Sequence, residues 1–369
     1  MIVESLLPLG KLDPGLREPE TPLDIARFAE LARTAEDVGL DAVLVEETKD
    51  DPFQLLALGA AATTRIRLGT SVAMAFPRSP TVTAMSAWSL AKVSGGRFML
   101  GLGSQVRAHV ERRFGVRWHP PAPRMRDYVN AVRAVWTCWQ DGTPLDFESE
   151  HYRLNLMVPL FDPGPIAHPH IPIHLAAIGP NMCAVAGEVA DGVRLHPVCT
   201  PLFIDDEVVP NLERGAARAG RDVGEIEVCM KPLIGTAPDA ARLARVAETV
   251  RARVAFYLST PSYRRTFRVH GWDDIAELED DFKLMYDGVF NHVSSKSYWF
   301  QQFLAGDPEY QEFFTVFSTR NALSDEQLAM IMRPRTSPVL TEFQTINGPR
   351  WVWTTFSEDL IDLNFKNPK

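Results

Sequence analysis

Long apolar runs, paired cysteines and an excess of basic residues are all missing from this sequence. No run reaches the roughly 18 apolar residues that a membrane span needs, and the first residues carry Glu4 without a basic start, so we expect a cytoplasmic protein with no membrane partner. The formal net charge of −9 argues against a nucleic-acid partner, because phosphate backbones are bound by clustered Lys and Arg. The four cysteines form no CxxC pair, so neither a disulfide framework nor a thiolate metal site is predicted.

Several catalytic motifs are missing as well. The sequence has no GxSxG elbow, no HExxH and no Walker loop, which argues against hydrolase, zinc-protease and nucleotidase functions. No internal repeat or low-complexity tract occurs. With 369 residues, 46% of them hydrophobic, the chain is long enough for one large domain or two ordinary ones with buried cores.

Helical stretches alternate with short β-branched runs as far as about residue 270. Seven such units favour a parallel (βα) barrel, although the alternation alone does not exclude an open, doubly wound sheet. The predicted strands are Ile2–Leu7, Ala42–Val45, Arg65–Met74, Phe98–Leu102, Pro172–Ile178, Val193–Pro197 and Val228–Gly235.

The composition changes after this region. From Leu278 onward only three alanines occur, and the last 91 positions hold 16 of the 35 aromatic residues (Phe 20, Trp 8, Tyr 7). No Gly/Ser linker marks the change. We therefore predict two pieces, residues 1–271 and residues 272–369, joined abruptly near Trp272.

Short motifs follow several strands of the first piece. They are Glu46-Glu47-Thr48, the run 68–72 (LGTSV), the run 94–105 (SGGRFMLGLGSQ) and the run 172–180 (PIHLAAIGP). Together they resemble the luciferase-like monooxygenase family, especially its deazaflavin-dependent oxidoreductase branch. The resemblance implies an α/β fold, a (βα)8 TIM barrel, with coenzyme F420 (an 8-hydroxy-5-deazaflavin) or FMN across the C-terminal ends of the strands. It also implies hydride transfer to or from a small-molecule substrate, and relatives often form homodimers.

The cofactor-binding residues that the resemblance implies all stand at strand ends, which face the active site of such barrels. The glycines let backbone approach a ligand closely, and the serine hydroxyl can donate to a phosphate oxygen. Relatives hold a non-proline cis peptide at Ser71-Val72 and a further glycine where this chain has Gln105. An ordinary turn is the alternative at each motif. The predicted cofactor-binding residues are Ser71, Val72, Gly103, Ser104, Ala177, Ile178, Gly179 and Pro180.

A proton acceptor is expected after the second strand, where many deazaflavin relatives have His. This chain has carboxylates there, and a partly buried carboxylate with a raised pKa can accept a proton. Glu47 is the predicted catalytic residue. The alternative is that these carboxylates favour the start of the next helix through its dipole. His109 and His196 also follow strands but are more typical of structural histidines, while Lys231 is either a phosphate ligand or a solvated charge.

The second piece resembles glycoside hydrolase family 13, in its sucrose-phosphorylase-like branch. The resemblance rests on the stretch from Trp272 to His292, with Asp287 four residues before Asn291, and on the run 341–353 (TEFQTINGPRWVW). It implies that Asp287 and His292 belong to a sugar subsite. Glycosyl transfer needs two carboxyl groups that this family carries on later strands, beyond Lys369, so the chain alone is not expected to perform it.

The junction lies at residues 269–275 (VHGWDDI), where the oxidoreductase relatives also have His-Gly-Trp and the sugar enzymes have Trp-Asp-Asp-Ile. The first piece lacks the last strand of its barrel, and an open edge would expose unpaired backbone groups. We expect Phe282–Phe290, a strand from the foreign barrel, to fill the eighth place. The rest, Val293–Lys369, is expected to be an irregular, weakly packed extension. A carbohydrate-binding remnant and an inactive fusion product are the alternatives to an oxidoreductase.

Overall fold

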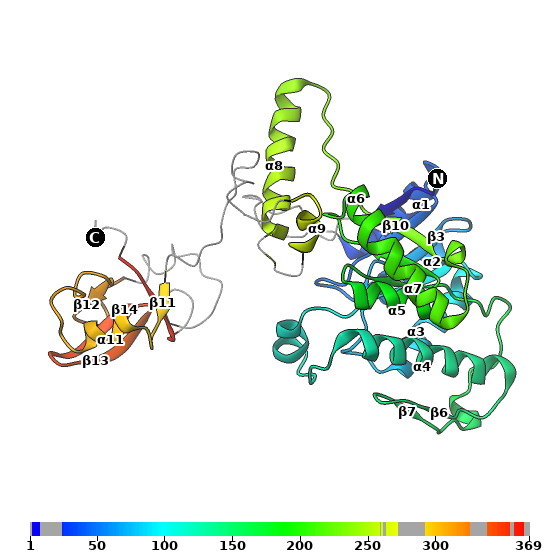
Figure 1. The fold of residues 1–369 in the computed structure, drawn as a ribbon, viewed down its shortest axis with the longest axis horizontal. Helices are drawn as coiled ribbons and strands as arrows, with labels where there is room; N and C mark the ends of the chain where they lie inside the picture. Colours follow the sequence, from blue (N-terminus) through cyan, green and yellow to red (C-terminus); the bar gives the residue numbers. More distant parts are fainter. Residues whose placement is uncertain are drawn as a thin grey trace. The chain divides into compact units, whose positions relative to one another are not determined.

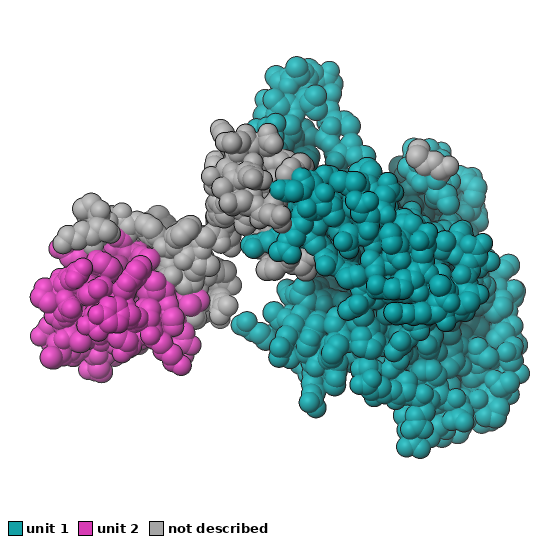
Figure 2. All heavy atoms as spheres, viewed as in Figure 1, with its two compact units in different colours: residues 1–285 teal, residues 286–369 magenta. Residues whose placement is uncertain are grey.

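The chain forms two compact units, Met1–Met285 and Tyr286–Lys369 (Figure 2). The computed structural model describes residues 2–7, 24–258, 260, 263–271, 292–324, 338–354 and 358–364. The predicted boundary between residues 271 and 272 adjoins a stretch outside this part of the chain, so the boundary stays a prediction.

A curved parallel sheet forms the centre of the first unit. Its hydrogen-bonded order is β1-β2-β3-β5-β8-β9-β10, with β4 paired to β5, and every pairing is parallel. β3 and β4 together correspond to one predicted strand, which is interrupted at Ser71-Val72. Counted as one, they give seven strand positions in the sheet, the number that the alternation predicted. The strands are β1 Glu4–Leu6, β2 Ala42–Val45, β3 Arg67–Thr70, β4 Ala73–Met74, β5 Phe98–Gly103, β8 Ile173–Ala176, β9 Gly192–Leu195 and β10 Glu227–Met230.

Helices follow the strands and lie around them (Figure 1). Capping residues mark where two helices begin. The Asp51 carboxylate accepts a hydrogen bond from the Phe53 amide (2.9 Å), and the Ser79 hydroxyl accepts one from the Val82 amide in the first turn of the next helix. The main helices are α1 Phe28–Asp37, α2 Pro52–Ala62, α3 Pro80–Ser94, α4 Pro121–Asp141, α5 Pro180–Val189, α7 Val209–Ala219 and α8 Ala240–Leu258. Shorter elements are η1 Ile25–Arg27, η2 His109–Arg113, β6 Phe147–Glu148, β7 Arg153–Leu154, η3 Pro159–Phe161, α6 Pro201–Phe203, η4 Ile204–Val208, η5 Val223–Glu225 and α9 Arg265–Arg268.

The strands in the middle of the sheet are buried on both faces. All four residues of β2 and all six of β5 are buried. This explains why these strands read as continuous apolar runs instead of alternating ones. Trp88, Tyr128 and Trp139, on α3 and α4, fill the space between the helices and are almost fully buried.

The two edges of the sheet differ from its centre. Within the described residues, β1 pairs only with β2 and β10 only with β9. On β10, Val228 is 47% exposed and Met230 is 38% exposed, and Ile2 and Val3 are exposed just before β1. The expected open edge between the seventh and first strands is therefore present in this part of the chain. Its predicted occupant, Phe282–Phe290, lies outside the described residues.

The second unit has a core of its own. The antiparallel strands β12 Val316–Phe317, β14 Gly348–Trp353 and β13 Leu340–Thr345 form one sheet, and β11 His292–Ser294 pairs antiparallel with β15 Leu360–Asp362. Beside them lies α11 Tyr298–Leu304. The core residues are Phe300, Phe303, Phe314, Val352 and Ile361.

The expectation of a weakly packed C-terminal extension is wrong for these residues. The rings of Phe300 and Phe303 stack with centroids 5.5 Å apart, and Phe314 meets Phe300 edge-on at 5.1 Å. The reason is local packing: α11 lies against the β13–β14 hairpin, where Phe300 meets Phe343 edge-on at 4.8 Å, so aromatic side chains are buried without the partner strands of a barrel. In neither unit is a described helix both long enough and apolar enough to span a bilayer.

Candidate functional site

A large cavity opens at the C-terminal ends of the strands in the first unit. Its volume is about 1610 Å³. Strand ends that are far apart in the sequence converge here because the sheet is parallel and curved. All nine predicted site residues line it: Glu47, Ser71, Val72, Gly103, Ser104, Ala177, Ile178, Gly179 and Pro180.

The Ser71-Val72 peptide between β3 and β4 is cis, as the resemblance implied. The neighbouring glycines of β5 make room for this break in the strand. A Cβ on Gly101 would lie 1.9 Å from the Thr70 carbonyl oxygen, and one on Gly103 would lie 2.6 Å from Cγ2 of Val72. From the sequence, these glycines are expected to let a ligand approach the backbone. In the structure, they let β5 pack closely against Thr70 and Val72.

The loop after β5 carries Ser104 and Gln105 along the cavity wall. Gln105 has a φ of +58°, in the left-handed region where glycine is favoured. Its side-chain oxygen accepts a hydrogen bond from the Val106 amide at 2.8 Å, which partly offsets the unfavourable backbone conformation. The backbone thus keeps the shape of a glycine position although the residue is glutamine.

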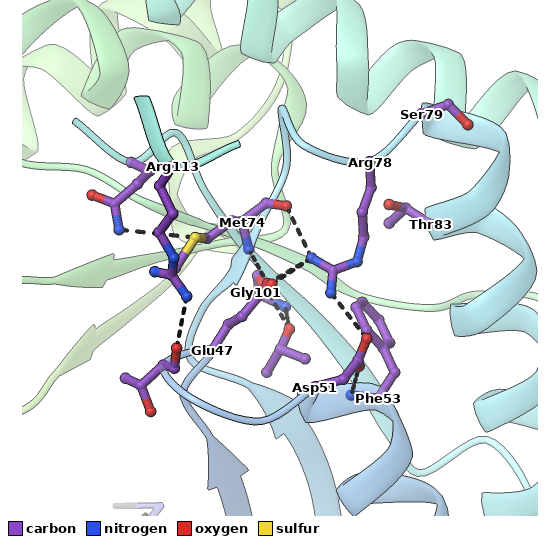
Figure 3. A network of polar contacts seen from close by, with 12 residues as sticks. Glu47, Asp51, Phe53, Met74, Arg78, Ser79, Thr83, Gly101 and Arg113 are labelled. Carbon is purple, nitrogen blue, oxygen red and sulfur yellow. Dashed lines mark hydrogen bonds and ion pairs between the residues drawn. The ribbon is translucent and has the colours of Figure 1, made fainter. Parts of the chain in front are cut away.

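Glu47 belongs to a hydrogen-bonded network centred on Arg78 (Figure 3). Arg78 donates to both oxygens of the Glu47 carboxylate at 2.7 and 2.8 Å and to Asp51 at 3.1 Å. The Met74 amide also donates to Glu47, at 2.7 Å. Burial opposes the charge on Arg78, but the bonds and charges of Glu47 and Asp51 outweigh it and raise the pKa of Arg78. The network fixes the backbone just after the cis peptide.

A second ion pair joins the ends of β2 and β10. Lys231 donates to the carboxylate of Glu46, and both residues line the cavity. Lys231 is therefore not an isolated solvated charge, and phosphate binding is not its sole role, because it forms an ion pair with Glu46. Nothing in the sequence indicates this ion pair, because Glu46 and Lys231 are far apart in the chain and meet only in the curved sheet.

An aromatic cluster forms another wall of the cavity. The imidazole of His196 stacks on Tyr263 with ring centroids 3.9 Å apart and meets Tyr257 edge-on at 4.5 Å. Burial, followed by the charge of Lys231, lowers the pKa of His196 to about 4, so the imidazole is neutral at neutral pH. His109, in contrast, is exposed on η2.

The start of α5 faces the same cavity. Gly179 precedes the helix, and Pro180, Asn181 and Met182 of its first turn line the cavity. Helix N-termini favour anions because their amide groups and the helix dipole point toward them. Nη1 of Arg265, on α9, is 3.8 Å from where a Cβ on Gly179 would lie. The sequence held no local signal for Arg265, because its position depends on α9 returning to this face.

The luciferase-like monooxygenase family model matches residues 8–311. The chain belongs to this family. The match extends past the predicted boundary at residue 272, so a junction inside the family region stays a prediction.

Luciferase-like relatives cover most of the chain. An uncharacterized protein of Mycobacterium tuberculosis is 43% identical over 254 residues, which are 69% of this chain and 75% of the relative. Among solved structures, the coenzyme F420-dependent tetrahydromethanopterin reductase from Methanopyrus kandleri superposes with a TM-score of 0.57 at 25% identity, covering 73% of this chain and 75% of that one.

A different protein matches a shorter stretch. Glucosylglycerate phosphorylase from Spirochaeta thermophila is 46% identical over 112 residues, which are 30% of this chain. The chain spans only 18% of that protein's length. A likeness to sugar phosphorylases therefore exists, as sequence analysis indicated, but it covers a small part of such an enzyme.

The cavity suits the phosphorylated cofactors of luciferase-like proteins. The first turn of α5 presents its N-terminus to the cavity, Arg265 lies beside Gly179 at this end, and Ser104 adds a hydroxyl to the cavity wall. The apolar residues Val72, Ala177 and Ile178 supply surface for a flat ring system. F420 and FMN both combine a ring system with a phosphate, so the donor set fits either.

Proposed function

We propose that the first unit is an oxidoreductase that transfers a hydride between a small organic substrate and coenzyme F420, with FMN as the alternative cofactor. The observation that carries the proposal is the convergence of the Ser71-Val72 break, the Ser104 loop and the α5 N-terminus on one cavity of about 1610 Å³. The F420-dependent reductase named above supports it, because it shares the fold at 25% identity.

In this proposal the residues divide into three roles. Ser104, Arg265 and the first turn of α5 bind the phosphate. The segments Ser71-Val72 and Ala177-Ile178 orient the ring system. The cofactor, when bound, supplies the hydride chemistry, so the protein has to place the substrate and manage one proton. Tyr257, Tyr263 and the neutral His196 provide an aromatic wall that excludes water from the substrate.

Two adjacent carboxylates are candidates for holding the proton. Glu47, the residue that the sequence indicated, already accepts hydrogen bonds from Arg78 and Met74, which suits a positioning role. Glu46 lines the same cavity and pairs with Lys231, whose charge can stabilise the carboxylate between proton transfers. We therefore propose Glu46 as the proton acceptor and Glu47 as the residue that holds the loop behind it.

Carbohydrate binding by the second unit is the other candidate function. It is favoured by the 46% identity to a glucosylglycerate phosphorylase. In this case the chain is a fusion of an oxidoreductase barrel with a sugar-phosphorylase fragment, joined near Trp272. The part of a phosphorylase that is matched does not amount to a whole enzyme, so binding without glycosyl transfer is the expected activity.

Cofactor titration of the purified full-length protein tests the proposal. We expect F420 or FMN to bind with one site per chain, followed by fluorescence. Ser104→Trp should weaken this binding at least about tenfold, because the bulky ring fills the phosphate end of the cavity. Ser86→Trp, on α3, is the matched control and should bind as the wild type does. Binding of a glucosyl compound without either cofactor would favour the second candidate, and binding of no ligand would indicate an inactive fusion product.

A further inference from the structure

Three potential metal ligands lie close together in the first unit: the buried His174, the exposed Glu227 and the partly buried Cys229. His174 is the second residue of β8, while Glu227 and Cys229 stand two apart on β10 and so point to the same side of the sheet. The Cys229 sulfur is 3.7 Å from Nδ1 of His174, and a Glu227 oxygen is 3.6 Å from Nε2. One nitrogen, one sulfur and one carboxylate oxygen of these residues all lie within 4.8 Å of one another.

His174 is the most constrained member of this cluster. Its side chain is 1% exposed, and among the described residues its Nε2 has no hydrogen-bond partner. A buried polar atom without a partner is costly, and such atoms in native proteins call for an explanation. The imidazole lies over Gly192 of β9, where a Cβ would come within 2.7 Å of Nε2. The absence of a side chain at Gly192 therefore leaves room for the imidazole ring of His174.

Two arginines, Arg194 and Arg67, lie near the imidazole of His174. The two arginines do not leave the cluster with uncompensated positive charge. Arg194 forms an ion pair with Glu4 at 2.9 Å, and Arg67 lies 3.7 Å from Glu227.

We propose that His174, Glu227 and Cys229 form a binding site for a divalent transition-metal ion of the zinc class. Imidazole, thiolate and carboxylate are the donors that zinc prefers, and three protein ligands leave one position for water. With metal–ligand bonds of about 2.0–2.3 Å, donor pairs on one zinc ion lie roughly 3.5 Å apart. The three donor atoms now lie within 4.8 Å of one another, so a shared ion would require them to come closer by up to about 1.3 Å.

The binding step balances without a redox partner. The Cys229 thiol gives its proton to solvent as the metal–sulfur bond forms, and the neutral His174 and the Glu227 carboxylate bind through existing lone pairs. Glu227 and Cys229 both line the large cavity, which gives the ion a path from solvent. A bound ion would join β8 to β10 across β9. It would thereby tie down β10, the strand at the open edge of the sheet.

Cobalt(II) titration of the full-length chain, first treated with a chelator, tests this site. We expect one equivalent of Co²⁺ to bind with a sulfur-to-cobalt charge-transfer band and visible d–d bands. Cys229→Ser should abolish the charge-transfer band, whereas Cys138→Ser, which removes a buried thiol on α4, should leave it unchanged. A wild-type protein without the band, or a band that survives Cys229→Ser, would overturn the proposal.

A second variant covers the case in which Cys229→Ser does not fold. Glu227 is 44% exposed in its side chain, so Glu227→Gln is not expected to disturb the core. It should weaken Co²⁺ binding about tenfold. Zn²⁺ should also raise the Tm of the wild type by several degrees and that of Glu227→Gln by less. Equal affinities and equal shifts in the two proteins would remove Glu227 from the site and contradict the three-ligand proposal.

Discussion

Glu46 and Glu47 are adjacent in the chain, but their carboxylates have different partners. Glu47 meets Arg78 and the Met74 amide, both within the loop after the cis peptide. Glu46 meets Lys231, which follows the opposite edge of the sheet. Successive residues at a strand end point in opposite directions, so neighbours with the same chemistry are placed in different environments.

Replacing each carboxylate by its amide separates the two roles. Glu46→Gln should lower turnover about 100-fold and leave cofactor affinity unchanged, because only proton transfer is removed. Glu47→Gln should weaken cofactor binding and lower the free energy of unfolding by about 2 kcal/mol, because a neutral amide replaces the carboxylate that pairs with Arg78. Cofactor titration, urea unfolding and turnover are measured on both variants. Lower turnover with normal affinity in Glu47→Gln would return the acceptor role to Glu47.

His196 should make stability depend on pH. Its folded pKa of about 4 lies below the ordinary value of 6.5, so between these values the unfolded chain binds the proton and the folded one does not. The free energy of unfolding should therefore fall as pH is lowered from about 6.5 to about 4, by up to about 1.4 kcal/mol per pH unit. Above about pH 6.5 this contribution should be constant.

Urea unfolding at about pH 7, 6 and 5 measures the His196 effect. His196→Gln should reduce the slope over this range by about half, because burial also lowers the pKa of His174, to about 3, and His174 contributes in the same direction. His170→Gln, which changes an exposed histidine, is the control and should leave the slope as it is. The same slope in wild type and His196→Gln would assign the pH dependence to other groups.

At the scale of elements, the helices α5 and α7 approach each other unusually closely through glycine. A Cβ on Gly215 of α7 would lie 1.8 Å from the Ala184 carbonyl oxygen on α5, and one on Gly187 would lie 2.1 Å from the Leu212 carbonyl oxygen. Both contacts are with backbone, which cannot rotate away as a side chain can. Because the first turn of α5 faces the cofactor cavity, the helix crossing also positions the proposed phosphate site.

Gly215→Ala should push α5 away from α7. We expect the free energy of unfolding to fall by about 2–3 kcal/mol, the usual cost of overpacking, and cofactor affinity to fall with it. Ala217→Ser, on the exposed side of α7, should change stability by no more than about 0.5 kcal/mol. Thermal unfolding and cofactor titration are the measurements. A Gly215→Ala protein as stable as the wild type would show that the helices can separate without cost.

For the whole molecule, the two hydrophobic cores are separate sets of residues. Phe300 is fully buried among aromatic rings of the second unit, whereas the first unit buries its own large core around the sheet. Phe300→Ala should destabilise the second unit by about 3–5 kcal/mol. Cofactor binding by the first unit should be unchanged.

Hydrogen exchange resolved by peptide checks the Phe300→Ala prediction. Peptides from residues 292–324 and 338–354 should lose protection, while those covering β2 and β5 keep it. Leu160→Ala, at a residue that is 84% exposed, is the control and should change neither set. Loss of protection throughout β2 and β5 would mean that the units unfold together.

Local patterns were sufficient to locate most of the elements. β2 has the predicted bounds, and α2 and α3 begin at Pro52 and Pro80, directly after their capping residues Asp51 and Ser79. The predicted strand over residues 65–74 is two strands, since the cis peptide ends the regular pairing between them. The C-terminal expectation failed because it assumed that the aromatic side chains need the missing barrel strands, whereas those of α11 pack against the β13–β14 hairpin.

The order of the strands and the gathering at one cavity of the residues that follow them could be predicted from sequence, because the parallel strands of a barrel end at the same face. The ends of individual strands could not: the predicted strand over residues 228–235 is β10, which ends at Met230. Nor does the sequence alone tell which side chains meet. The Glu46–Lys231 pair, the approach of Arg265 to α5 and the meeting of His174 with Cys229 join residues 185, 86 and 55 positions apart. The spacing of the cysteines predicted no thiolate metal site, whereas the curved sheet places one of them beside a buried imidazole. Only the tertiary structure decides such contacts, because the curvature of the sheet and the return of α9 set the distances between them.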